Sequence, residues 1–130
     1  MRHVRRTRFR SLVLGAAATL LVLPALAGRV HADDGQAVTV QGEIVDMACF
    51  MSKGSRGASH KACAQMCAKK GVPIGVLTDG GDLFLLLDDH NNPDPYDAAK
   101  KLAGDRAEVS GKKLSKPGVT GILVGGVKGL

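Results

Sequence analysis

The chain has 130 residues, 18 Lys+Arg and 12 Asp+Glu, which give a formal net charge of +6 at pH 7. The charge excess is confined to residues 1–32, which contain six arginines and no acidic residue. The remaining residues carry 12 Lys+Arg against 12 Asp+Glu and are formally neutral. Since proteins bind nucleic acid mainly by neutralising phosphates with Lys and Arg, this balance excludes a basic nucleic-acid groove. We therefore predict no nucleic-acid partner.

The N-terminal residues have the pattern of a secretory signal peptide. Five arginines between positions 2 and 10 precede an apolar stretch at residues 12–26, and small residues follow it. The apolar stretch is shorter than the roughly 20 residues that span a bilayer. We expect cleavage after Ala32 or after Ala27, no stable membrane anchor after cleavage, and a periplasmic or secreted protein.

After the signal peptide at residues 1–32, the chain has a short leader at 33–36 and enough length for one domain at 37–130. The whole chain has no Trp, one Tyr and three Phe, so the core must be built from Val, Leu, Ile, Ala and Met. Five segments have the alternating or continuous apolar pattern of β-strands. They are residues 37–46, 73–78, 82–88, 106–114 and 119–127.

Two segments have the signals of helices. Residues 60–70 follow a Gly/Ser-rich loop at 51–59, with Ser59 as the expected N-cap and Gly71 as the residue after the C-cap. A second helix is predicted from Asp94, its expected N-cap, to about residue 102. Within the first strand, Gly42 indicates a bulge or a sharp bend.

Without the helix at 60–70, the predicted order is that of an OB-fold, with five strands and a helix between the third and fourth. The strand glycines Gly42 and Gly111 and the stretch LAGDRAEVSGKKL resemble the barrel edges of bacterial exported OB-fold proteins. The segment DxxCF…HKxCAxxC is similar to that of small secreted bacterial proteins. The resemblance implies a mainly β, α+β domain with two helices: a five-stranded OB-like barrel with the Cys/His helix inserted between strands 1 and 2.

The three cysteines and one histidine form the candidate functional site. His60, Cys63 and Cys67 fall at i, i+3 and i+7, so on a helix they share a stripe roughly 60° wide. Cys49, at the end of the first strand, completes a Cys3His set. Thiolate and imidazole donors suit copper(I) or zinc. We therefore predict an exported domain that binds one of these metal ions through the four side chains.

A structural disulfide is the alternative use of the cysteines. In an oxidising compartment Cys49 can pair with Cys63 or Cys67, which leaves one free thiol or a disulfide-linked dimer. The domain would then be a non-catalytic module whose barrel binds a small ligand or a protein partner. No nucleophile motif or phosphate-binding loop is present, so we predict no enzyme activity.

Overall fold

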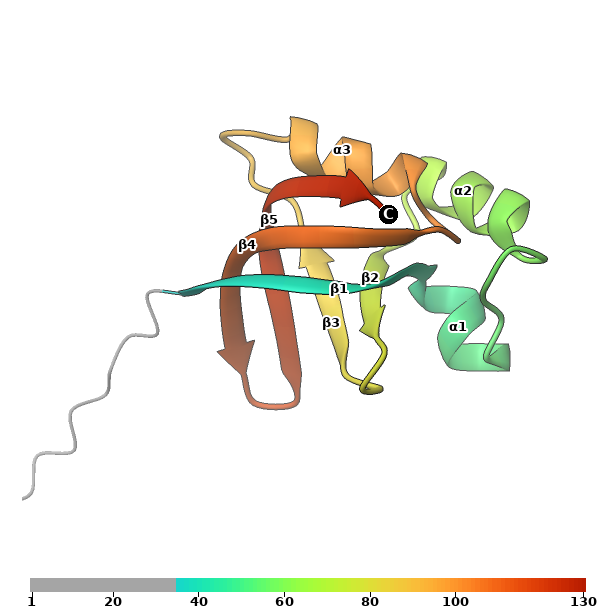
Figure 1. Ribbon diagram of the computed structural model, residues 1–130, viewed down its shortest axis with the longest axis horizontal. Coiled ribbons are helices and arrows are strands. Elements are labelled where there is room, and N and C mark those ends of the chain that lie inside the picture. The colour runs from blue at the N-terminus through green and yellow to red at the C-terminus, as the bar shows by residue number, and fades with distance from the viewer. Residues whose placement is uncertain (1–34) are drawn as a thin grey trace, which may run out of the picture. The chain divides into compact units, whose positions relative to one another are not determined.

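Five β-strands close into a barrel in the computed structural model, which describes residues 35–130 (Figure 1). The neighbour order is β1-β2-β3-β5-β4, with β4 pairing back onto β1. Only the β3–β5 pair of the barrel is parallel. The predicted signal peptide and its cleavage sites lie outside the described residues. The strands are β1 (Gln36–Asp46), β2 (Ile74–Thr78), β3 (Leu83–Leu87), β4 (Arg106–Lys116) and β5 (Val119–Gly129).

Three helices accompany the barrel. Helix α3 (Asp94–Lys101) joins β3 to β4, as predicted. Helices α1 (Met47–Lys53) and α2 (Lys61–Lys69) occupy the segment between β1 and β2, residues 47–73, which we call the insert. The described chain is thus a closed, mostly β barrel, consistent with an OB-like arrangement, and α2 and α3 lie side by side at one end of it (Figure 1).

The prediction of two helices was wrong, because α1 replaces the expected strand end and part of the expected loop. Cys49 therefore lies on a helix and not at the end of β1. The expected N-caps are also wrong: His60 and Pro93 occupy the N-cap positions of α2 and α3, and neither makes a side-chain capping hydrogen bond. Gly71 does follow the C-cap residue of α2, with φ 92°.

The core consists of aliphatic residues and alanines, as the scarcity of aromatic residues predicted. Alanines are the core contribution of α2 and α3, since their small side chains allow a helix to lie close to the barrel. Methionine was expected in the core, but no methionine of the described residues is fully buried, and Met51 and Met66 are 68% and 55% exposed. The central buried residues are Ile44, Ile74, Val76, Leu86, Val109, Ile122 and Val124, with Ala64, Ala68, Ala99 and Ala103 from the helical segments.

Strand glycines allow backbones to cross closely at two places. A Cβ on Gly42 would lie 2.2 Å from the carbonyl oxygen of Leu77, and one on Gly111 would lie 2.1 Å from that of Leu123. The pairing of β1 with both neighbours runs through Gly42 without a register shift, so of the expected bulge or sharp bend the bulge is not there. The irregularity lies instead in the β4–β5 pair at Ser110/Gly111.

Replacing Gly42 with alanine tests this close approach. The added methyl group overlaps a backbone oxygen that cannot move without shifting β2, so we expect Gly42→Ala to lower the free energy of unfolding by about 1–3 kcal/mol or more. Urea denaturation measures the change. Gly80→Ala is the matched control, because a Cβ there meets nothing closer than 3.7 Å. Equal stability of the two variants would contradict the steric explanation.

Candidate metal centre

Asp46, the last residue of β1, is the side chain around which the site is built. It is fully buried, at 0% exposure. Its Oδ1 accepts the backbone N–H of Cys49 at 2.8 Å, which caps the N-terminus of α1. Its Oδ2 lies 2.8 Å from Nε2 of His60, at the start of α2. One carboxylate therefore fixes the beginnings of both helices that carry cysteines.

The ionisation of Asp46 determines how His60 is oriented. Burial on its own raises the pKa of this carboxyl group, but the N–H of Cys49 and the ring of His60 outweigh burial, and the net pKa lies below its ordinary value. A carboxylate can only accept hydrogen bonds, so Nε2 of His60 must carry the donated proton. In the neutral imidazole this leaves Nδ1 free to act as an acceptor or a metal ligand.

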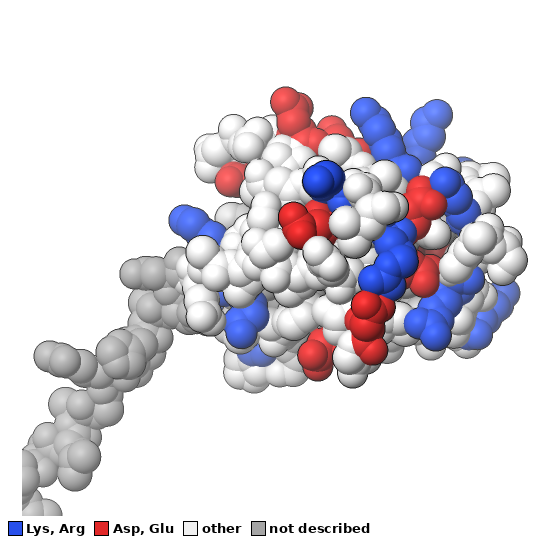
Figure 2. Space-filling view, viewed as in Figure 1, with Lys and Arg blue, Asp and Glu red and all other residues white. Residues whose placement is uncertain are grey.

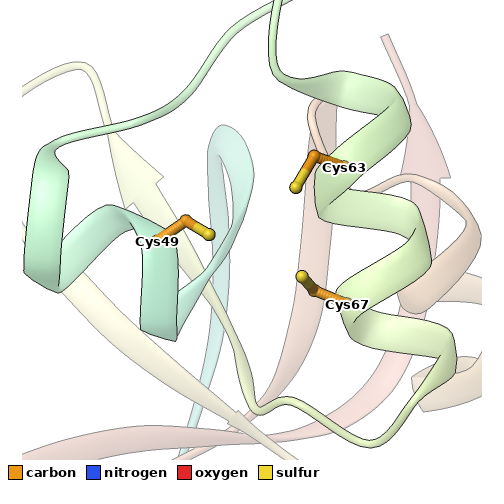
Figure 3. A group of neighbouring side chains, drawn as sticks. All are labelled: Cys49, Cys63 and Cys67. Carbon is orange, nitrogen blue, oxygen red and sulfur yellow. The ribbon is translucent and has the colours of Figure 1, made fainter.

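The rotation of α2 about its axis directs its cysteines toward α1. Ala64 and Ala68 are each 1% exposed and pack into the core. Cys63 and Cys67 each precede one of these alanines, so their shared stripe is turned by about 100° from the buried one. Figure 3 shows both side chains pointing across to Cys49 on α1. The buried alanines thereby set the direction of the thiols.

The three thiols meet at one point between α1 and α2. Their Sγ atoms all lie within 4.8 Å of one another, and none is in a disulfide (Figure 3). For comparison, two sulfurs on one tetrahedral zinc ion lie about 3.8 Å apart when the Zn–S bonds are about 2.3 Å. Cys63 is exposed, and Cys49 and Cys67 are half-buried. Small side-chain rotations would bring the three sulfurs onto one metal ion.

His60 belongs to a second, overlapping group. Asp46, Cys49 and His60 each offer a ligand atom within 4.8 Å of the other two, and Cys49 is common to both groups. The predicted Cys3His set therefore appears as a compact thiol group with His60 beside Cys49, where Asp46 holds one ring nitrogen. This arrangement resembles the carboxylate–histidine pairs that orient imidazole ligands in metal sites.

The two half-buried thiols are poor nucleophiles. Burial raises the pKa of Cys49 to about 11, and the neighbouring Asp46 carboxylate adds to the rise. The pKa of Cys67 is also raised, first by burial and then by the adjacent Cys63 thiol. Reactive cysteines need a lowered pKa, because the thiolate is the nucleophile. A metal ion can still bind by displacing the thiol protons.

Asp46 is the site residue that the sequence pattern did not reveal. A signal for it is present, since an Asp directly before a short helix is a preferred N-cap that bonds to the residue three positions on. With a strand predicted at residues 37–46 and a loop at 51–59, however, no helix was expected for Asp46 to cap.

Comparisons of the chain with protein-family models, with curated proteins and with solved structures gave no match. Within residues 35–130, none of the helices has the length and apolar character needed to cross a membrane. The residues of the site are therefore the basis for assigning a function.

Replacing Asp46 with asparagine tests its positioning role. The asparagine amide is uncharged and has only one acceptor oxygen, so it cannot accept both hydrogen bonds. We therefore expect Asp46→Asn to lower the free energy of unfolding by about 2–4 kcal/mol. Urea denaturation near neutral pH measures this, and Asp82→Asn, at an exposed aspartate, should change little.

The pH dependence has a defined sign. Because the pKa of Asp46 is depressed in the folded protein, its contribution is fully present above the unfolded-state pKa and is lost as the pH falls through the lower folded-state pKa. The difference between wild type and Asp46→Asn should therefore shrink below about pH 4. A difference that stayed constant down to about pH 2 would contradict a role for the charged form.

Proposed function

We propose that this domain binds one soft transition-metal ion, copper(I) or zinc, through Cys49, Cys63 and Cys67, in metal handling or sensing. The observation that carries the proposal is the convergence of three free thiols, from two separate helices, within 4.8 Å. Thiolate donors select soft or borderline cations over Mg²⁺ and Ca²⁺. A set of three sulfurs from rigid elements is also pre-organised, which favours binding.

His60 distinguishes the two metals within this proposal. Copper(I) is satisfied by three thiolates, whereas zinc in protein sites usually takes four ligands. His60 is our candidate for the fourth ligand, because it lies beside Cys49 and its Nδ1 is the ring nitrogen that Asp46 leaves free. Zinc binding should therefore depend on His60, and copper(I) binding should not.

The cellular setting that we propose is the periplasm or the cell exterior, supported by the signal-peptide pattern of residues 1–32 and the resemblance to exported OB-like proteins. In that setting a disulfide competes for the same cysteines. A disulfide between any two of them would remove two of the three donors. Thiol counting on protein purified without metal distinguishes three free thiols from one.

Serine substitutions test the ligand assignment. Cys49→Ser, Cys63→Ser and Cys67→Ser should each weaken copper(I) binding by about a hundredfold or more, since each removes one of three soft donors. Competition with a copper(I) chelator measures the affinity under anaerobic conditions, and elemental analysis should give one ion per chain.

Three matched variants accompany this test. Met51→Leu and Met66→Leu remove exposed thioethers of the two cysteine-bearing helices and should leave the affinity unchanged. His60→Gln should weaken zinc binding and spare copper(I). Stoichiometric metal that survives both Cys63→Ser and Cys67→Ser would disprove the proposed site.

Metal affinity should also rise steeply with pH. Because the raised pKa values keep the thiols of Cys49 and Cys67 protonated at neutral pH, binding must displace at least these two protons. The apparent affinity should then increase about a hundredfold per pH unit between about pH 6 and 8. Chelator competition corrected for the chelator's own protonation measures the slope. An affinity independent of pH would show that the thiols are not the ligands.

A further inference from the structure

The charges of the domain are segregated between the insert and the barrel. Residues 47–73 contain five basic residues and no acidic one, whereas the other described residues contain seven basic and ten acidic. Figure 2 shows Lys and Arg side chains over the end of the molecule where α1 and α2 lie. The basic residues of the insert are Lys53, Arg56, Lys61, Lys69 and Lys70. The insert, which carries the three thiols, is therefore the cationic part of a near-neutral domain.

Most of these cations have no partner in the described part of the chain. Lys61 pairs with Asp105 at 2.7 Å and helps to hold α2 on the barrel. The other four are exposed and take part in no ion pair within residues 35–130. Structural pairing thus accounts for one of the five.

The free cations flank the thiols along both helices. Lys53 lies four residues after Cys49 on α1, and Lys70 lies three residues after Cys67 at the end of α2, so each shares a helix face with a thiol. Both lysines are exposed, so their charge is available to a partner in solvent.

The insert also exposes soft apolar side chains. Of the four large hydrophobic residues exposed in the described chain, Met51 and Met66 belong to the insert, and Cys63 is itself exposed. Methionine adapts to varied partners and is favoured at surfaces that bind other proteins. A metal ion at this site would be reachable by a ligand from outside.

We propose that the insert surface docks an acidic face of a second protein that exchanges its soft metal ion with the three-cysteine site. This rests on the metal-binding function proposed above. The partner's chemistry is inferred from complementarity: acidic residues around an accessible thiol-bound ion would meet unpaired cations around accessible thiols. Each thiol of the domain that binds the ion gives up a proton, each donor thiolate that leaves takes one up, and the metal keeps its oxidation state.

Transfer kinetics test the docking. Two synthetic peptides share one Cys-x-x-Cys site loaded with copper(I), and glutamates flank the site in one and lysines in the other. The wild-type protein should take the ion from the glutamate peptide at least about tenfold faster at low ionic strength, because electrostatic steering raises association rates. The preference should largely vanish in about 1 M salt, where the Debye length is about 3 Å.

Two triple variants with the same change of charge locate the effect. Lys53→Gln with Lys69→Gln and Lys70→Gln should slow transfer from the glutamate peptide several-fold and leave the equilibrium copper(I) affinity unchanged. The control variant replaces Lys112, Lys116 and Lys128 with glutamine, at exposed positions on β4 and β5, and should stay within about twofold of wild type.

The outcomes distinguish failure of the docking from failure of metal binding. A wild-type protein that binds no copper(I) at equilibrium overturns both. Two outcomes overturn only the docking. In the first, the wild-type protein binds copper(I) tightly but takes it equally fast from both peptides. In the second, the control variant loses as much transfer rate as the insert variant. A third outcome also overturns the docking: the wild-type protein sediments with phosphatidylglycerol vesicles, and the insert variant loses this sedimentation but keeps the wild-type transfer rate. The surface would then bind a membrane.

Discussion

A single buried carboxylate organises the candidate site. Placing a charge at 0% exposure is costly, and Asp46 is tolerated because its two oxygens receive the Cys49 N–H and the His60 ring. Within the described residues no buried side-chain polar atom lacks a hydrogen-bond partner. The backbone of Asp46 belongs to the barrel through its pairing with Ile74, and its side chain belongs to the insert. The position of β1 therefore fixes, through the Asp46 side chain, where the two helices that carry the thiols begin.

Stability and chemistry are divided between two parts of the domain. The barrel contains most of the aliphatic core, while the insert contributes little to it beyond Ala64 and Ala68. Those two alanines nevertheless fix the rotation of α2, and through it the direction of Cys63 and Cys67. The site thus follows the general rule that function is carried by residues added to a scaffold, which constrains their placement without specifying their chemistry.

The elements that could be predicted from the sequence are those with a periodic or local pattern. Alternation, glycine turns and strand order indicate the five strands, the helix between the third and fourth, and the helix that carries Cys63 and Cys67. Helix α1 could not be predicted, because seven residues give too few turns for a helical period, and the helix depends on the capping by Asp46. The meeting of Cys49 with the other thiols depends on how the chain between α1 and α2 folds back, and no spacing encodes that. The pairing of Asp46 with His60 could not be predicted for the same reason, because the two residues are 14 positions apart.

The insert leaves and re-enters the barrel at neighbouring points. Asp46 and Ile74 are paired across β1 and β2, and the N–H of Met47 donates to the carbonyl of Pro73 at 2.9 Å, one step beyond that pair. The two ends of the insert are therefore held together by the sheet and not by the insert itself. Opening of the insert would therefore not by itself separate the paired ends of β1 and β2. A ligand that joins α1 to α2 would oppose that opening. Its binding would therefore stabilise the insert against local unfolding and change the stability of the barrel little.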